Sequence, residues 1–190
     1  WSDSSRDRLL SVCFSQDGWN WSAGFPVIPN HRITIKARNL AGQTALLKVR
    51  NIDNDGTVVV VFGEEHPEFP TYKIHNASSH PVLIHQYLAT PHVYETIPAG
   101  ASVAYAWDDP ALQPMLLEVV SISGDEKILL DLDNMGLFNT SNPEQLLQLS
   151  PETGLGHFYG VVSAEGPTKI ATIKDMDSAK PFPKFGGKAI

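Results

Sequence analysis

The chain has 190 residues, with 21 acidic and 14 basic side chains and a formal net charge of −7 at pH 7. This balance excludes a basic field of the kind that neutralises phosphates, so we expect no nucleic-acid partner. No apolar run approaches the roughly 18 residues of a membrane-spanning helix, and the first residues, WSDSSRDRLL, lack the basic and apolar regions of a signal peptide.

The single cysteine, Cys13, favours a reducing compartment, because no internal disulfide can form. It lies in the apolar run LLSVCF, where we expect a buried structural thiol rather than a nucleophile. Three Asn-X-Ser sequons, at Asn20, Asn76 and Asn139, leave secretion and glycosylation as an alternative. The lack of cysteine pairs makes the cytoplasm the favoured location.

In chain order, the first clear strand is TVVVVF (57–62), a β-branched run typical of a strand buried on both faces. It is followed by TYKIHN (71–76) and PVLIHQ (81–86), which alternate apolar and polar residues at period two. Only NPEQLLQL (142–149) has the pattern of a helix, with Asn142 as its cap and Pro143 in its first turn. The sequence therefore predicts an all-β protein with one short helix.

Glycine and proline residues separate the predicted strands. Glycine reaches positive φ without steric cost and proline presets φ, so both favour tight reversals. We expect such reversals at Asn54-Asp55-Gly56, Pro98-Ala99-Gly100, Ser123-Gly124-Asp125 and Glu165-Gly166-Pro167.

Two similarities inside the chain indicate a duplication. One joins WSDSSRDRLLSVC, from Trp1, to WDDPALQPMLLEVV, from Trp107. The other joins LLKVRNIDNDGTVVVVF (46–62) to HFYGVVSAEGPTKIATI (157–173), where two apolar strands flank a glycine turn. The shared spacing fits one antiparallel sandwich of about 100 residues. We therefore predict tandem antiparallel β-sandwich repeats: the C-terminal part of one repeat over 1–62, a complete second repeat over 63–175, and a tail over 176–190.

No motif of the chain assembles a catalytic, cofactor or metal site. The sequence has no HExxH, CxxC, GxSxG, phosphate-binding glycine loop or dinucleotide fingerprint. His75 and His85 each follow an isoleucine on an alternating strand, so we expect both to face solvent on the side opposite the core. His66 stands in an acidic loop, GEEHPE, without a second cluster to complete a site. We expect no enzyme, no cofactor and no metal.

Tryptophans offer an alternative function, because an exposed ring can stack on a sugar. Trp19 and Trp21 occur in WNWS, and Trp107 precedes two aspartates. In an antiparallel sandwich such residues are more often core or corner residues, which is the interpretation that we favour. A carbohydrate-binding domain or a purely structural sandwich stays the alternative, and sugar binding requires at least one of the three to be exposed.

Three stretches together resemble a known family: YKIHNASSHPVLIHQY (72–87), ETIPAGASVAYAWDDP (95–110) and LLEVVSISG (116–124). They contain an aromatic strand that ends in Asn, a strand that closes on Gln, a Pro-x-Gly turn and an aromatic Trp-Asp-Asp-Pro corner. This combination is similar to the adaptor-binding domain of vacuolar protein sorting-associated protein 13, also called the SHR-binding domain. WNWSAGF (19–25) and GPTKIATIKD (166–175) extend the likeness over roughly residues 1–175.

The resemblance implies six tandem β repeats, each marked by an asparagine, in a large bridge-like protein that moves lipids between organelles at contact sites. It implies a cytoplasmic module, peripheral at organelle membranes, that recruits this protein by binding a Pro-x-Pro motif of membrane-resident adaptor proteins. Asn76 stands at the marker position. We expect its amide to be buried and to bond to neighbouring backbone rather than to contact a ligand.

The chain carries a Pro-x-Pro motif of its own in KPFPKF (180–185). Three hypotheses account for it: an adaptor peptide fused to the domain, the beginning of a next strand as in HPEFPTYKI (66–74), or a disordered natural tail. The residues that would form the peptide motif are Pro181, Phe182, Pro183, Lys184 and Phe185.

A bound proline-spaced peptide loses little entropy on docking, because its φ angles are already fixed. We expect it to add to an exposed strand edge and to place its phenylalanine or proline rings in apolar pockets. The candidate groove lies beside Phe62, Phe69 and Tyr72, where the first predicted repeat ends and the second begins.

Overall fold

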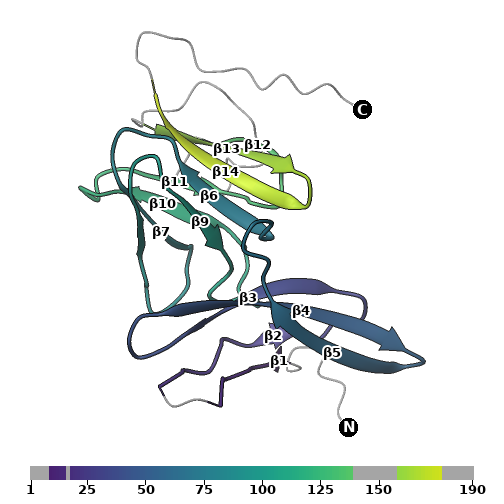
Figure 1. Cartoon of the computed structure of the whole chain (residues 1–190). Helices are drawn as coiled ribbons and strands as arrows, with labels where there is room; N and C mark the ends of the chain where they lie inside the picture. Colours follow the sequence, from purple (N-terminus) through teal and green to yellow (C-terminus); the bar gives the residue numbers. More distant parts are fainter. Residues whose placement is uncertain (1–8, 16–17, 139–157, 177–190) are drawn as a thin grey trace, which may run out of the picture. The chain divides into compact units, whose positions relative to one another are not determined.

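A computed structural model describes residues 9–15, 18–138 and 158–176 of the chain. Every regular element in these ranges is a β-strand, which confirms the predicted all-β class (Figure 1). The predicted helix at 142–149 and the motif at 180–185 lie outside the described residues. The chain divides into two compact units: unit 1 comprises residues 1–69 and 106–113, and unit 2 comprises 70–105 and 114–190.

Unit 1 contains an antiparallel three-stranded sheet and a separate pair of very short strands. The sheet has the order β3 (Arg32–Arg38), β4 (Thr44–Asn54), β5 (Thr57–Glu64), and the pair consists of β1 (Leu9–Leu10) and β2 (Phe25–Pro26). Alternate side chains of a strand point to one face, so the sheet buries one apolar face. The core there consists of Phe25, Ile35 and Val49, against which Val12, Ile33, Leu47 and Val60 pack.

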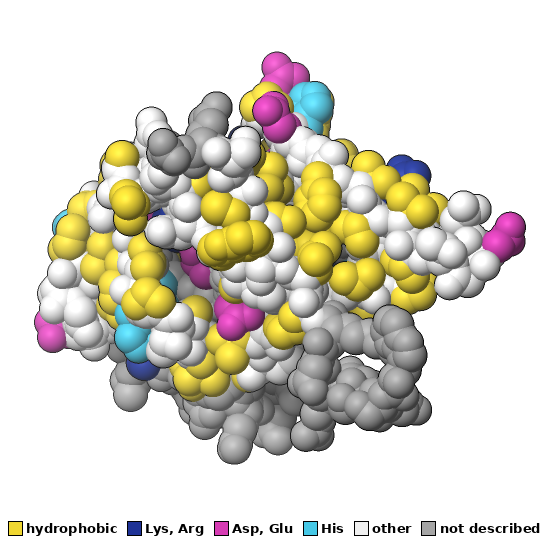
Figure 2. Space-filling model, turned by 90° about the horizontal axis from the view of Figure 1, so that it is seen from below, with side chains coloured by type: hydrophobic (Ala, Val, Ile, Leu, Met, Phe, Trp, Pro, Cys, Tyr) yellow, Lys and Arg dark blue, Asp and Glu magenta, His cyan; other side chains and the backbone are white. Residues whose placement is uncertain are grey.

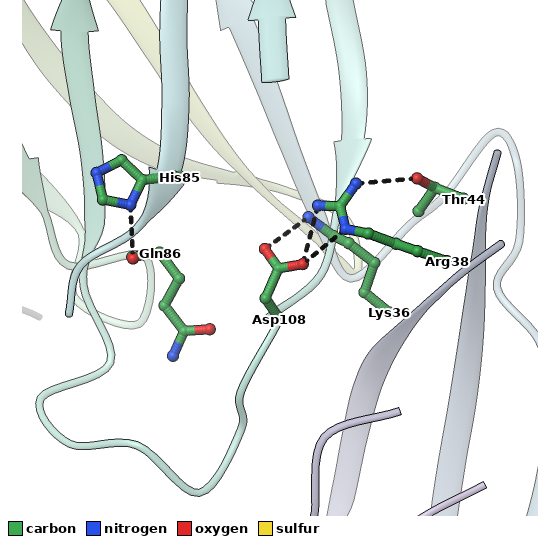
Figure 3. A network of polar contacts seen from close by, with 6 residues as sticks. All are labelled: Lys36, Arg38, Thr44, His85, Gln86 and Asp108. Atoms are coloured by element: carbon green, nitrogen blue, oxygen red, sulfur yellow. Dashed lines mark hydrogen bonds and ion pairs between the residues drawn. The ribbon is translucent and has the colours of Figure 1, made fainter. Parts of the chain in front are cut away.

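Residues 106–113 complete unit 1. Trp107 is almost fully buried and forms a parallel bridge with Ile35, which confirms the core interpretation for this tryptophan. The next residue, Asp108, accepts hydrogen bonds from Lys36 Nζ (3.3 Å) and from Arg38 Nε and Nη2 (3.1 and 2.8 Å), as Figure 3 shows. The Lys36 side chain is buried, and a buried charge needs such a partner to offset its lost hydration.

The prediction that TVVVVF is buried on both faces is wrong. These residues form most of β5, which is an edge strand paired with β4 alone among the described residues. Val60 faces the core of unit 1, whereas Val59 and Val61 point the other way and are 41% and 45% exposed. A β-branched run therefore predicts a strand, but it does not predict whether both faces of that strand are buried.

Unit 2 is formed by two sheets. The five-stranded sheet has the order β12 (Gly136–Phe138), β13 (Phe158–Glu165), β14 (Thr168–Asp175), β6 (Tyr72–Asn76), β9 (Ser102–Tyr105). The four-stranded sheet has the order β11 (Lys127–Leu130), β10 (Leu117–Ser121), β7 (Val82–Gln86), β8 (Glu95–Ile97). All neighbouring strands are antiparallel except β6 and β14, which run parallel. The predicted antiparallel sandwich is thus confirmed, with one parallel pair that no short-range signal indicates.

The predicted turn chemistry is confirmed at the two long hairpins. Between β4 and β5, Asp55 and Gly56 have φ angles of 50° and 81°, as a two-residue type I′ turn requires. Between β13 and β14, Gly166 has a φ of 56°. The repeat boundaries at residues 62 and 175, and the duplication itself, stay predictions.

The close approach of the two sheets in unit 2 requires a glycine at position 160. A Cβ added to Gly160 would lie 3.0 Å from Leu130 Cδ1, and Cδ2 would be closer still. Leu130 is fully buried, so its methyl groups can shift only by displacing other core atoms. We predict that Gly160→Ala lowers the free energy of unfolding by about 1–3 kcal/mol, measured by urea denaturation.

The matched control is Gly63→Ala in β5, where an added Cβ meets no atom within 4 Å. We expect this variant to unfold at about the same urea concentration as the parent. In a Leu130→Ala background the cost of Gly160→Ala should shrink, because the clashing methyl groups are gone. An undiminished cost in that background would contradict the packing account.

Candidate functional site

The side chain of Asn76 makes all the hydrogen bonds that an amide can make. It lies at the end of β6 and is completely buried. Its Nδ2 donates to the carbonyl oxygens of His80 (2.8 Å) and Ile97 (2.9 Å). Its Oδ1 accepts from the Ser78 amide (3.1 Å) and the Ser78 hydroxyl (2.6 Å). These bonds join β6, in one sheet, to β8, in the other.

The backbone of Asn76 adds three further connections. Its N–H donates to Ala101 O, its carbonyl accepts from Gly100 N, and the next amide, of Ala77, donates to Ile173 O in β14. The expected burial and backbone bonding of this asparagine are therefore observed. Because the amide nitrogen is fully occupied inside the protein, the Asn76 sequon cannot carry a glycan in this fold. The network also fixes the path of residues 77–81.

A pocket of about 650 Å³ lies against this loop, wholly within unit 2. Its walls come from three segments: residues 78–82 after β6, residues 121–126 between β10 and β11, and the paired ends of β13 and β14. Ser79 N donates to Asp175 Oδ2 at 2.8 Å, which ties the first segment to the third. The described residues that line the pocket are Ser78, Ser79, His80, Pro81, Val82, Ser121, Ile122, Ser123, Asp125, Glu126, Phe158, Asp175 and Met176.

The lining of this pocket combines apolar and acidic side chains. Val82, Ile122, Phe158 and Met176 supply apolar surface, and Ile122 is 59% exposed at the top of the turn. Three carboxylates, from Asp125, Glu126 and Asp175, also line it, whereas no Lys or Arg does so among the described residues. Such a lining can hold an apolar side chain next to a cationic one.

Sequence reasoning missed these pocket residues. The available signal was the turn Ser121-Ile122-Ser123-Gly124, in which an isoleucine occupies a reversal between two serines. An apolar side chain at the tip of a turn is exposed to solvent, where polar residues are usual, so it indicates a surface that contacts another molecule. The β13–β14 hairpin brings Phe158 beside Asp175, and only the pairing of β14 with β6, which is distant in sequence, brings both to the loop after Asn76.

The prediction that His85 faces solvent is wrong. His85 is 4% exposed, and its Nε2 bonds to Glu118 Oε2 on the neighbouring strand. Figure 3 shows its second ring contact, from Nδ1 to Gln86 O at 2.8 Å. The side chain does point away from the sandwich core, as the alternation predicts, but Tyr94 and His92 cover it with ring contacts at 4.5 and 5.4 Å. His75 is partly exposed and bonds to Ser102 Oγ.

Lys127 pairs with the other oxygen of Glu118 at 3.0 Å. The hydrogen bond and the negative charge of Glu118 raise the pKa of Lys127 above its usual 10.5. Glu118 is thus held between His85 on β7 and Lys127 on β11. This cluster fastens three strands on the outer face of the four-stranded sheet.

The predicted groove residues are divided between the two units. Phe62 and Phe69 belong to unit 1 and are exposed, and the Phe69 ring lies 5.3 Å from that of His66. Tyr72 belongs to unit 2 and is buried, with its hydroxyl bonded to Asp133 Oδ1 at 2.8 Å. The groove stays a prediction. The five residues of the peptide motif, from Pro181 to Phe185, lie outside the described residues.

The tryptophans and the cysteine differ in their surroundings. The core or corner interpretation is wrong for Trp21, which is 73% exposed, while Trp19 is half-buried with its ring 4.5 Å from that of Phe14. Cys13 is half-buried rather than buried, and its thiol donates to Trp19 O.

Within the described ranges, no group of three or more His, Cys, Asp or Glu side chains could hold a metal ion. No helix there is long and apolar enough to cross a membrane.

The Asn76 network generates a prediction about stability. Asn76→Ala removes the hydrogen bonds of its amide to Ile97 O and to the Ser78 N–H in a buried site, while His80 O keeps the Ser78 hydroxyl, so we expect a loss of about 3 kcal/mol in the free energy of unfolding. Urea denaturation measures this loss. The control Asn20→Ala, at an exposed position, should change it by less than about 0.5 kcal/mol. Equal effects of the two substitutions would refute the structural role of Asn76.

The Glu118 cluster generates a second prediction, on a pKa. Glu118→Gln removes the carboxylate that raises the pKa of Lys127, so this pKa should fall toward 10.5 in an NMR titration of the lysine side chain. The raised pKa means that the folded protein favours charged Lys127. The contribution of this charge to the free energy of unfolding is therefore present at neutral pH and is lost as pH rises above about 10.5. Asp175→Asn is the control, and an unchanged pKa in Glu118→Gln would contradict the pairing.

Comparison with known proteins identifies the family. Residues 1–114 match the family model described as vacuolar-sorting associated protein 13, adaptor binding domain. The chain is 28% identical over 136 residues to human intermembrane lipid transfer protein VPS13D, a match that covers 70% of the chain. It is 27% identical over 133 residues, 69% of the chain, to intermembrane lipid transfer protein tipC of Dictyostelium discoideum. In both cases the chain spans about 3% of the relative's length.

The family match extends across more than half of the chain, and it includes Asn76 and the buried Trp107. The expectation that the sequence motifs raised is therefore confirmed: the chain belongs to the adaptor-binding domain family of vacuolar-sorting associated protein 13.

Proposed function

We propose that this chain is a non-enzymatic recruitment module that binds Pro-x-Pro peptide motifs of membrane-resident adaptor proteins. In this proposal it brings a bridge-like lipid transfer protein to organelle membranes and contact sites, as a cytoplasmic and peripheral component. The family is named for adaptor binding, and the relatives are named intermembrane lipid transfer proteins. Because the chain spans about 3% of these relatives, we assign lipid transfer to other parts of such proteins and recruitment to this domain.

The observation that carries the proposal is the pocket at the Asn76 loop. It is apolar where Ile122, Phe158 and Met176 line it, and acidic where Asp125 and Asp175 do. A peptide such as Lys-Pro-Phe-Pro-Lys-Phe offers the complementary groups: rings for the apolar wall and lysines for the carboxylates. We expect the rings to supply most of the affinity and the lysines mainly to speed the encounter.

Proline spacing suits such a pocket for an entropic reason. Each proline fixes φ near the extended conformation, so less conformational freedom is lost when the peptide docks. One fully buried Phe side chain stabilises a complex by roughly 1.5–3 kcal/mol, and two such anchors are compatible with micromolar binding after the costs of association. The motif in this chain, Pro181-Phe182-Pro183 with Lys184 and Phe185, fulfils these requirements. We retain a fused adaptor peptide as the leading hypothesis for its origin.

The proposal predicts a measurable affinity for the chain's own motif. The receptor is the full chain with Pro181→Ala and Pro183→Ala, so that its own terminal segment does not compete. The probe is a fluorescein-labelled peptide of residues 178–187, followed by fluorescence anisotropy. We expect micromolar binding, and a peptide with both prolines changed to alanine should bind at least about tenfold more weakly.

Variants of the receptor locate the site. Ile122→Asp should weaken binding at least about tenfold, because it places a like charge beside the acidic wall and removes apolar contact. Met135→Asp is the matched control, since Met135 is an equally exposed apolar residue of unit 2 outside the pocket. Loss of binding in Phe69→Asp but not in Ile122→Asp would transfer the site to the predicted groove. Equal affinity for the proline and alanine peptides would refute recognition of the motif.

A further inference from the structure

The end of β14 forms part of the wall of the pocket in unit 2. β14 ends at Asp175, and both Asp175 and Met176 line the pocket together with Phe158, the partner of Asp175 on β13. Ser79 N donates to the Asp175 carboxylate at 2.8 Å, so this end of β14 is fastened to the loop after Asn76. The residues that follow Met176 in the chain therefore begin at the wall of the pocket.

The Pro-x-Pro motif follows Met176 after a short connection. Four residues, Asp177-Ser178-Ala179-Lys180, separate Met176 from Pro181. An extended chain advances at most about 3.3–3.6 Å per residue, so Pro181 lies no more than about 18 Å from Met176. Aspartate and serine favour reversals of the chain. The connection is therefore long enough to turn back to the pocket and too short to carry the motif far from it.

The charges of the pocket and of the motif are opposite. Three carboxylates line the pocket, from Asp125, Glu126 and Asp175, and no Lys or Arg does so among the described residues. The Asp125 side chain has no hydrogen-bond or ion-pair partner within the part of the chain that the structure describes. Neighbouring carboxylates repel one another, and a cation between them relieves this repulsion. Lys180 and Lys184, on either side of the motif, are such cations.

The apolar wall of the pocket has uncovered surface for a ring such as that of Phe182. Ile122 is 59% exposed at the tip of its turn, and Met176 is partly exposed. Val59 and Val61 also expose apolar side chains, on the β4–β5 hairpin of Figure 1, which projects to the right in Figure 2. These valines belong to unit 1, whereas the carboxylates that complement the lysines belong to unit 2. The pocket therefore offers the motif both kinds of contact.

We propose that the pocket binds the Pro-x-Pro segment of its own chain, residues 180–185, and that this intramolecular contact competes with the motif of an adaptor. The inference rests on the proposed function, because it gives the same pocket a second, tethered ligand. A short flexible connection holds such a ligand at an effective concentration in the millimolar range. At micromolar intrinsic affinity the tethered segment fills most pockets, so a separate motif binds with reduced apparent affinity.

Two forms of the full chain measure this competition. One is unaltered, and the other carries Pro181→Ala and Pro183→Ala, which weaken the tethered ligand without changing the lining of the pocket. Both are titrated against the fluorescein-labelled peptide of residues 178–187 and followed by fluorescence anisotropy. The unaltered chain should bind this peptide about tenfold more weakly than the double-alanine variant, because its own motif occupies the pocket.

A longer connection is the control that leaves the motif intact. Insertion of about 20 Gly/Ser residues between Ala179 and Lys180 lowers the effective concentration roughly tenfold, because this concentration falls as about the −3/2 power of linker length. The lengthened chain should therefore bind the labelled peptide several-fold more tightly than the unaltered chain. Val61→Asp in the unaltered chain should leave the affinity as it is, since Val61 lies outside the pocket.

The outcomes separate this inference from the proposed function. Equal affinities of the unaltered chain and the double-alanine variant would overturn the inference alone, whereas no binding to the variant would overturn both. Displacement of the labelled peptide from the variant by micromolar unaltered chain would show that the segment acts between copies, which contradicts the inference. Tighter peptide binding after Val61→Asp would place the segment on the hairpin of unit 1, and that result contradicts it as well.

Discussion

The side-chain amide of Asn76 is the interaction on which the architecture of unit 2 depends. The amide nitrogen donates to His80 O and Ile97 O, and the amide oxygen accepts from the N–H and the hydroxyl of Ser78. These bonds satisfy polar groups that burial would otherwise leave unpaired. The amide therefore joins the two sheets and fixes the loop of residues 77–81. The pocket lies against this loop, so in the proposed function the asparagine positions the binding residues without contacting the peptide.

Local sequence patterns predicted the strands and turns well, because alternation and glycine chemistry act over a few residues. Asp55-Gly56 and the β6 alternation are examples. They could not predict which side chains are buried or which strands lie at an edge, because both depend on residues far apart in the chain. His85 points outward as the strand alternation requires, yet Tyr94 and Glu118 bury it. TVVVVF forms an edge because β4 is its only neighbour among the described strands. The pocket was missed for the same reason. Phe158 pairs with Asp175 across two strands, and the Asp175 carboxylate accepts a hydrogen bond from Ser79 N, so that residues distant in sequence line one pocket.

The pocket in unit 2 has a distinct chemistry. Carboxylates and the exposed Ile122 line it, which in the proposed function suits an extended motif with cationic flanks.

The most direct test of adaptor recognition is the set of contacts made by a bound motif, determined by NMR with the labelled chain and an unlabelled Pro-Phe-Pro peptide. The account predicts intermolecular contacts from the peptide rings to the side chains of Ile122 and Phe158, with the largest amide shifts at Ser79 and Ser123. Contacts confined to Phe62 and Phe69, with no change in the loop after Asn76, would contradict it.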